Sequence, residues 1–204
     1  MNRNREGEGP GPSRILPEGI AKKIRLVVLD VDGVLTDGGV YMSALPDGES
    51  LEMKRFDIRD GLGVKLLQWA GIEVAVVSGR VSEATAIRAR ELGITECHQD
   101  GGAQKIRAIN GILERMELDW DQVAMLGDDL PDLAVLKRVG VPAVVADATD
   151  EVRKVALWQG KCRGGRGAVR EFCEAILRGR GVWDALVEEY VTARSGDGKE
   201  SKRS

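Results

Sequence analysis

Aromatic residues, histidine and cysteine are scarce in this chain of 204 residues. Phe, Trp and Tyr make up 4% of it, which predicts an aliphatic core and excludes an aromatic platform for stacking nucleic-acid bases. The three cysteines, Cys97, Cys162 and Cys173, cannot all pair and show no CxxC spacing. We therefore expect reduced thiols and a cytoplasmic protein. We expect His98, the single histidine, to be structural rather than catalytic.

Long apolar runs and an excess of one charge are also missing. No run approaches the ~18 residues of a membrane span, and the first residues are polar, unlike a secretory signal. Thirty basic and 33 acidic residues give a net charge of −3, which does not attract a polyanion over long range. These absences predict no nucleic-acid partner and no membrane partner.

Apolar strands alternate with amphipathic helices between residues 22 and 192. We predict strands over 24–29, 74–77, 123–126 and 141–145, and helices over 61–70, 82–92, 105–117, 130–139, 150–157 and 168–177. This alternation is typical of right-handed βαβ units, so we predict an α/β fold with a parallel sheet flanked by helices. The polar segments 1–21 and 193–204 are predicted to be disordered tails.

One insertion interrupts the alternation. Between residues 33 and 57, two extended pieces over 39–42 and 52–56 are joined by Pro46-Asp47-Gly48, which is typical of a turn. We predict a β-hairpin that is too short to form a large lid domain.

Polar side chains follow three of the predicted strands. They are Asp30 and Asp32, then Ser78, Gly79 and Arg80, and finally Asp128, Asp129 and Asp132. Ligands of open parallel sheets bind at the carboxyl ends of the strands. Carboxylates that converge there repel by ~4 kcal/mol per pair, and an all-oxygen cluster favours Mg²⁺, which completes its shell with water and phosphate. The cluster therefore predicts phosphoryl chemistry.

The spacing of these residues suggests roles in phosphoryl transfer. Asp30 and Asp32 lie two residues apart in extended chain, on one side, so that one can attack phosphorus while the other donates a proton. Ser78 and the Gly79 amide suit phosphate oxygens at a helix N-terminus. Lys105, which opens a predicted helix, can neutralise the transferred group.

The segments DVDGVLTD (30–37), VVSGR (76–80) and GDDLPD (127–132), with Lys105, resemble the four motifs of the haloacid dehalogenase superfamily. GGRGAVRE (164–171) and GVWDALVEEY (181–190) extend the likeness, over residues 24–190, to its octulosonate-phosphate phosphatases. The resemblance implies a Rossmann-like fold with a short hairpin cap. It also implies a Mg²⁺-dependent phosphatase of 3-deoxy-D-manno-octulosonate 8-phosphate in lipopolysaccharide biosynthesis.

The resemblance also implies a metal site and a nucleophile. Asp30 would form an aspartyl-phosphate and bind Mg²⁺. Asp32 would act as general acid and base and offer its main-chain carbonyl to the metal. Asp128 would be the second carboxylate ligand, with Asp129 and Asp132 in support. An alternative role for Asp132 is to cap the helix that begins near Leu133.

The remaining implied roles concern the substrate. Ser78 and Gly79 would bind phosphate, and Lys105 would hold the nucleophile and the phosphoryl group. Arg80 would distinguish octulosonate phosphatases from relatives with Glu there, and Arg88 would contact the sugar carboxylate. For both arginines a purely structural role is the alternative. The segment HQDGGAQK, which ends at Lys105, is one residue longer than the usual form.

The resemblance further implies a homotetramer in which the hairpins pack together and a neighbour closes each site. Three alternatives stay open. A phosphatase of a nine-carbon keto acid 9-phosphate is disfavoured by Arg80. A phosphotransferase or phosphomutase would need a larger cap. A non-catalytic module is disfavoured because Asp30, Asp32, Lys105 and Asp128 are all present.

Overall fold

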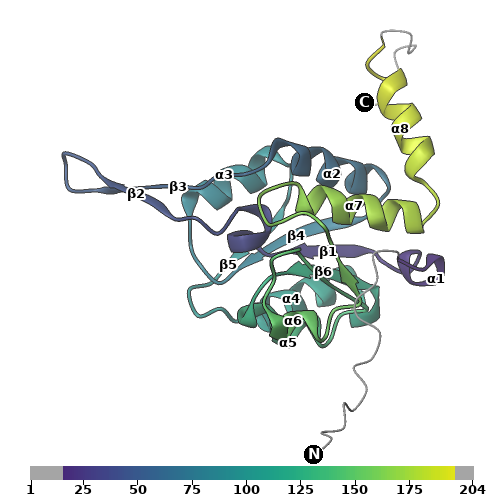
Figure 1. The fold of residues 1–204 in the computed structure, drawn as a ribbon, viewed down its shortest axis with the longest axis horizontal. Helices are drawn as coiled ribbons and strands as arrows, with labels where there is room; N and C mark the ends of the chain where they lie inside the picture. The colour runs from purple at the N-terminus through teal and green to yellow at the C-terminus, as the bar shows by residue number, and fades with distance from the viewer. Residues whose placement is uncertain (1–15, 196–204) are drawn as a thin grey trace, which may run out of the picture.

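A six-stranded parallel sheet forms the centre of the computed structural model, which describes residues 16–195. The strand order is β5-β4-β1-β6-β7-β8 (Figure 1). The strands are β1 (Leu26–Leu29), β4 (Glu73–Ser78), β5 (Glu96–Gln99), β6 (Val123–Gly127), β7 (Val141–Val144) and β8 (Trp158–Gln159). All residues of β1 and β6 are buried, as continuous apolar runs in parallel sheets usually are.

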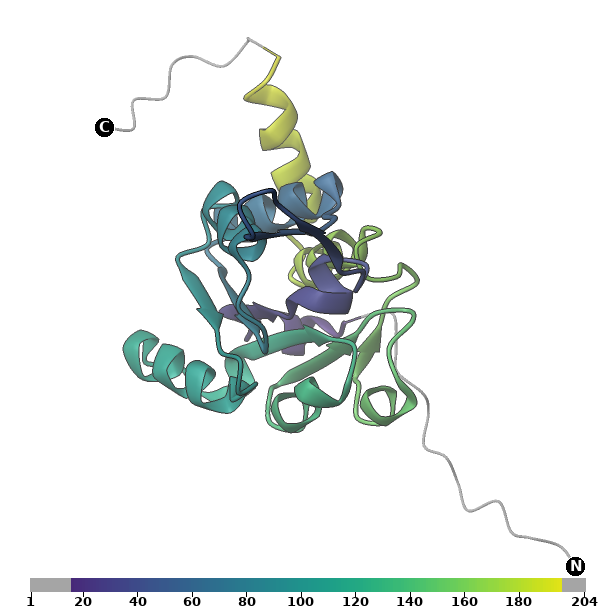
Figure 2. The ribbon, with the colours of Figure 1, turned by 90° about the vertical axis from the view of Figure 1, so that its left-hand side faces the viewer.

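Helices cover both faces of this sheet (Figures 1 and 2). One face carries α2 (Ile58–Trp69), α3 (Glu83–Glu91) and α7 (Ala168–Gly179); the other carries α4 (Lys105–Met116), α5 (Leu130–Leu136) and α6 (Asp150–Arg153). The chain steps outward from β1 to β5 and then crosses back to β6. Right-handed crossovers therefore put the two helix sets on opposite faces. This architecture confirms the predicted fold class.

The core is aliphatic, as predicted. Most of the largest fully buried side chains are Ile or Leu, and Trp158 and Phe172 are the aromatic exceptions. Their ring centroids lie 5.0 Å apart, a separation typical of stabilising aromatic pairs. No helix among residues 16–195 is both long enough and apolar enough to cross a membrane.

The predicted insertion is a β-hairpin, and both of its strands lie about two residues closer to the turn than expected. It consists of β2 (Tyr41–Ala44) and β3 (Ser50–Met53), which pair antiparallel. Its base follows the turn η1 (Val31–Leu35) and closes with a bridge between Thr36 and Phe56. The hairpin extends away from the domain (Figure 1), so its β2 residues are exposed.

Several predicted boundaries were wrong. Residues 18–21, expected in a disordered tail, form α1 (Glu18–Ala21), whose Ala21 is buried against the end of α7. The predicted helix over 150–157 ends at Arg153 and is followed by β8; β5 and β8 are short edge strands without a long apolar run. A last helix, α8 (Trp183–Thr192), projects from the domain. The predicted disorder of 1–15 and 196–204 lies outside the described residues.

Candidate active site

Three neighbouring strand ends build the site. Asp30 follows β1, Ser78 ends β4 and Asp128 follows β6. The registers align Leu29 of β1 with Val76 of β4 and Leu126 of β6, so these polar residues emerge at one edge of the sheet. The convergence expected from the sequence is therefore present.

Lys105, the first residue of α4, connects two of the carboxylates. Its Nζ lies 2.6 Å from Oδ1 of Asp30 and 2.6 Å from Oδ1 of Asp132, and its side chain is buried. Burial alone would lower the pKa of Lys105, but the charges of Asp132 and Asp30 outweigh it and raise that pKa. Lys105 is therefore a fixed cation beside Asp30, in spite of the lengthened loop before it.

Asp132 serves to position its neighbours. It is fully buried; Oδ1 pairs with Lys105, and Oδ2 accepts a hydrogen bond from the Asp128 amide at 3.0 Å. A Cβ on Gly127 would lie 2.5 Å from Asp132 Oδ2, so glycine is needed for this approach. The exposed Asp129 is the N-cap of α5 and accepts from the Leu130 amide. The alternative that Asp132 caps this helix was therefore wrong.

The remaining carboxylate oxygens fit a divalent cation. Ligand oxygens of Asp30, Asp128 and Asp132 lie within 4.8 Å of one another. Oδ1 of Asp128 is buried without a hydrogen-bond partner. Burial, together with the charges of Asp30 and Asp132, raises the pKa of Asp128 to about 8. Burial and Asp132 raise the pKa of Asp30 to about 6. A hard cation would relieve this repulsion and occupy the unpaired oxygen.

Gly33 makes room for this arrangement. Its φ is +96°, a backbone conformation that residues other than glycine rarely adopt. A Cβ at this position would lie 2.1 Å from Oδ2 of Asp128. Asp32-Gly33 is a dipeptide that is common in turns, but here Gly33 allows Asp128 to approach the backbone of η1.

Ser78, Gly79 and Arg80 continue from β4 along the same edge. The Ser78 hydroxyl is buried and accepts a hydrogen bond from the Arg80 amide at 3.1 Å. A Cβ on Gly79 would lie 3.0 Å from the Cβ of Ala103, in the loop before Lys105. The Arg80 guanidinium reaches the hairpin, where Nη2 lies 3.0 Å from Oε1 of Glu52.

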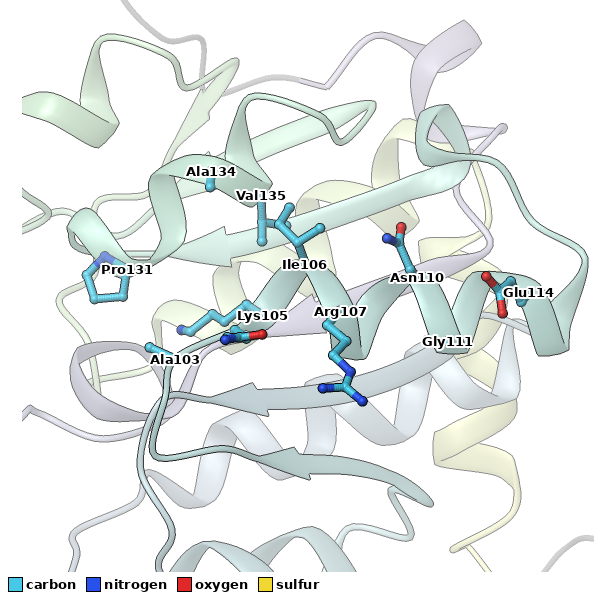
Figure 3. Close-up of a pocket in the computed structure, with 11 residues that line it drawn as sticks. Ala103, Lys105, Ile106, Arg107, Asn110, Gly111, Glu114, Pro131, Ala134 and Val135 are labelled. Carbon is cyan, nitrogen blue, oxygen red and sulfur yellow. The ribbon is translucent and has the colours of Figure 1, made fainter.

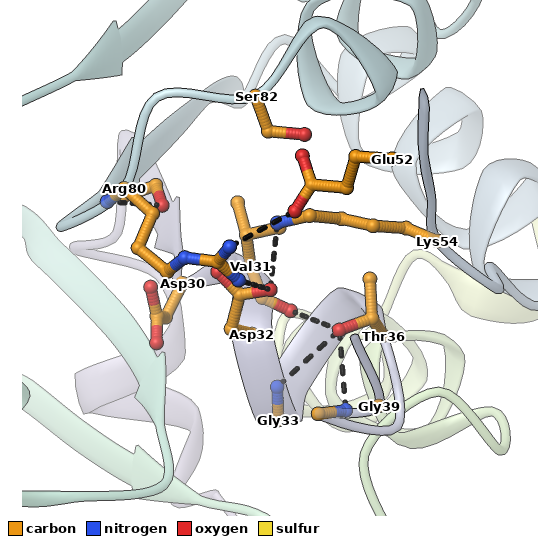
Figure 4. Close-up of polar contacts among 12 residues, drawn as sticks. Asp30, Val31, Asp32, Gly33, Thr36, Gly39, Glu52, Lys54, Arg80 and Ser82 are labelled. Carbon is orange, nitrogen blue, oxygen red and sulfur yellow. Dashed lines mark hydrogen bonds and ion pairs between the residues drawn. The ribbon is translucent and has the colours of Figure 1, made fainter. Parts of the chain in front are cut away.

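The Asp32 carboxylate takes no part in the acidic cluster. Its Oδ1 lies 2.7 Å from Nζ of Lys54 and 3.8 Å from Nη1 of Arg80 (Figure 4). The Lys54 side chain has no exposed surface. Lys54 follows β3, and sequence reasoning missed it because nothing local distinguishes a lysine at the end of a hairpin strand.

The structure does not bring Arg88 to the acidic cluster. Arg88 is buried near the hairpin base, where it donates to the Asp57 carbonyl at 3.3 Å and pairs with Glu91 at 2.8 Å. Its guanidinium carbon lies 5.7 Å from the ring centroid of Phe56. The geometry of one chain therefore gives Arg88 a packing role.

The glycine-rich loop 164–167 packs against η1. The Gly165 amide donates to the Val34 carbonyl at 3.0 Å. Arg55 donates to the Gly165 carbonyl at 2.6 Å and lies 3.7 Å from Asp37. This contact ties the backbone around Asp32 to the segment that leads into α7.

A surface cavity of about 660 Å³ lies between α4 and α5 (Figure 3). Lys105 lines this cavity, but Asp30, Asp128 and Asp132 do not. Since the Lys105 ammonium bonds to Asp30 and Asp132, this cavity is not the site of the chemistry.

Comparisons with known proteins agree with this geometry. Residues 99–170 match the haloacid dehalogenase-like hydrolase family. The 3-deoxy-D-manno-octulosonate 8-phosphate phosphatase KdsC of Escherichia coli K12 is 42% identical over 164 residues, which cover 80% of this chain and 85% of that protein.

Two solved structures are similar over most of their length. The Moraxella catarrhalis 3-deoxy-D-manno-octulosonate 8-phosphate phosphatase, in complex with magnesium ion, phosphate ion and KDO, has 36% identity and a TM-score of 0.78, covering 85% of this chain and 97% of that chain. The cobalt-bound Haemophilus influenzae enzyme has 35% identity and a TM-score of 0.75, covering 84% of this chain and 99% of that chain. These metals and the acidic cluster support a divalent-metal site here. The chain belongs to the 3-deoxy-D-manno-octulosonate 8-phosphate phosphatase family of haloacid dehalogenase-like hydrolases.

Proposed function

We propose that this phosphatase hydrolyses 3-deoxy-D-manno-octulosonate 8-phosphate to the free sugar acid and phosphate, with Mg²⁺ as its metal. The observation that carries the proposal is the Asp30 carboxylate at the end of β1, held by Lys105 at 2.6 Å next to the unpaired Oδ1 of Asp128. The named relatives support the substrate.

Asp30 performs the first step. One of its oxygens attacks phosphorus, and the bond to the sugar oxygen breaks as an aspartyl-phosphate forms. Asp32 gives its proton to that departing oxygen, and then accepts a proton from the water that attacks the aspartyl-phosphate. The second step releases phosphate and restores the Asp30 carboxylate.

Lys105, Ser78 and the Gly79 amide bind the phosphoryl group. The ammonium beside Asp30 offsets the charge of the phosphate oxygens as they approach the carboxylate. Asp30, Asp128 and the main-chain carbonyl of Asp32 would hold the Mg²⁺. When bound, the metal neutralises the charge between the carboxylates and the phosphate. Two further carboxylates support these metal-binding groups. Asp132 orients Asp128 and Lys105, and Asp129 caps the adjoining helix.

Arg80 binds the substrate carboxylate in this proposal. Its guanidinium lies at the hairpin edge of the site and is half-exposed, within reach of a sugar bound above Asp30. Glutamate at this position would repel the same carboxylate. The proposal leaves Arg88 out of the substrate site.

A homotetramer in the cytoplasm completes the proposal. Six large apolar residues of the hairpin are exposed: Val40, Tyr41, Met42, Leu45, Leu51 and Met53. An exposed apolar patch of this kind marks an interaction site, and packing of hairpins would cover it and close each site with a neighbour. Light scattering tests the assembly, and a fully active monomer would contradict it.

Phosphate release tests the function directly. We expect the octulosonate phosphate to exceed a panel of other sugar phosphates in kcat/KM, and Asp30→Asn to abolish turnover, since an amide does not attack phosphorus. Arg80→Glu should raise KM for the octulosonate phosphate more than for a small neutral phosphate ester. Equal turnover of all esters would contradict the substrate, and a normal rate of the Asp30 variant would contradict the covalent step.

A further inference from the structure

The hairpin brings two charged side chains to the edge of the site. Lys54 donates to Asp32 Oδ1 at 2.7 Å, and Glu52 of β3 accepts from Arg80 Nη2 at 3.0 Å. Arg80 in turn lies 3.8 Å from the Asp32 carboxylate. Figure 4 shows the four side chains facing one another between the hairpin and η1. Two cations and two anions therefore join the cap to the catalytic loop.

Lys54 is the unusual member of this group. Lysine is rarely buried, because its charge loses hydration and its long side chain loses rotamer freedom. The side chain of Lys54 has no exposed surface, and Asp32 is its ion-pair partner. The hairpin itself does not need this charge, since β2 and β3 pair through their backbones and the base closes between Thr36 and Phe56.

A charge-assisted hydrogen bond of this length restricts the carboxylate that accepts it. The Asp32 side chain keeps 23% of its surface exposed, so packing alone does not fix its rotamer. The Lys54 ammonium supplies the missing restraint from the hairpin side, through Oδ1 of Asp32.

We propose that Lys54 is a positioning residue, which donates to Oδ1 of Asp32 and thereby directs Oδ2, the oxygen that carries the transferred proton, toward the leaving oxygen. Asp32 loses this proton as the phosphorus–oxygen bond breaks, and Lys54 keeps its own protons throughout. This inference rests on the proposed function, in which Asp32 is the proton donor. The hairpin thereby contributes to the chemical step as well as to assembly.

The test uses two esters that differ in their need for a proton. A sugar alkoxide leaves poorly unless it is protonated, whereas p-nitrophenolate leaves without help. Lys54→Met keeps the apolar length of the side chain and removes its charge. We expect kcat for the octulosonate phosphate to fall about tenfold to a hundredfold, as for a misplaced catalytic group, and kcat for p-nitrophenyl phosphate to fall less than about threefold.

Arg55→Met is the matched comparison. Arg55 is the next residue and also ties the hairpin base to the domain, through Gly165 and Asp37, but it does not touch Asp32. We expect Arg55→Met to change kcat for both esters by the same factor. In an Asp32→Asn background, adding Lys54→Met should change neither rate further, since the group that it positions is gone.

Each outcome decides between the two proposals. If Asp32→Asn is selective for the sugar ester but Lys54→Met slows both esters equally, as Arg55→Met does, the positioning role is wrong and the proposed function stands. A further tenfold loss in the double variant would also overturn the positioning role. If Asp32→Asn itself slows both esters equally, the proton-donor role is wrong and the inference falls with it. Light scattering and thermal unfolding confirm that the variants keep their fold and assembly.

Discussion

Substitution of Gly164 should damage the part of the active site around Asp32, which lies more than 130 residues earlier in the sequence. Gly164 opens the loop that packs on η1, and a Cβ there would lie 1.8 Å from the Gly33 carbonyl oxygen and 3.0 Å from that of Thr36. A carbon–oxygen contact needs about 3.3 Å, so the two backbones must separate by about 1.5 Å. Both obstacles are backbone atoms, which no rotamer change can move.

This displacement acts on the groups next to Gly33. Asp32 precedes it, and the Asp128 carboxylate fills the space where its Cβ would lie. A shift of about 1 Å in a catalytic group costs about a hundredfold in rate, and overpacking costs about 1–3 kcal/mol of unfolding free energy. We therefore expect Gly164→Ala to lower kcat/KM about a hundredfold and the Tm by about 2–12 °C.

Steady-state kinetics and thermal unfolding measure the two effects. Gly19→Ala is the control, because nothing lies within 4 Å of a Cβ at that position in α1. It should leave kcat/KM unchanged. If Gly164→Ala kept kcat/KM within about threefold of the original enzyme and the same Tm, the close packing of loop 164–167 on η1 would not support the site.

Three more predictions follow from the charged groups. Asp128→Asn should raise the Tm of EDTA-treated protein, because burial and like charges raise the pKa of this carboxyl to about 8. The same variant should no longer show an increase in Tm when Mg²⁺ is added, and a retained increase would place the metal elsewhere. Asp57 caps α2 and pairs with Arg59, so Asp57→Ala should lower the urea-derived unfolding free energy by about 1–2 kcal/mol, and no loss would contradict the cap. Burial raises the pKa of Asp60 to about 6, above ~3.9 in the unfolded chain. The contribution of protonated Asp60 to the free energy of unfolding is therefore complete at low pH and is lost as the pH rises through about 6. Relative to Asp60→Asn, the original chain should lose about 1 kcal/mol between about pH 5 and about pH 7.5, and a constant difference would show that the charge is solvated.

The sequence was sufficient to predict the sheet and the residues at its edge. Parallel strands place their carboxyl ends together whatever the loops do, so Asp30, Ser78 and Asp128 could be grouped before any coordinates were known. Short edge strands escaped this reasoning. β5 contains Glu96, Cys97, His98 and Gln99, and its place in the sheet depends on pairing with β4 rather than on its own pattern.

Contacts between distant segments could not be predicted from the sequence. Asp132 lies four residues after Asp128, which suggests a helix cap, but its partner Lys105 belongs to another helix. The motif that contains Arg80 is recognisable, whereas Glu52 on the hairpin, its ion-pair partner, is not. Such pairs depend on how elements dock, and local spacing carries no information about docking.

The two acidic residues of the first motif show what docking adds. Their spacing predicts that one attacks phosphorus and the other donates a proton, without saying which. In the structure Asp30 is buried beside Lys105 and Asp128, while Asp32 is partly exposed and faces the hairpin through Lys54. A nucleophile needs the cations that neutralise an incoming phosphoryl group, and a proton donor needs access to the leaving group and to water. Access to the leaving group and the placement of Lys105, rather than the residue type, therefore favour Asp30 as the nucleophile and Asp32 as the acid.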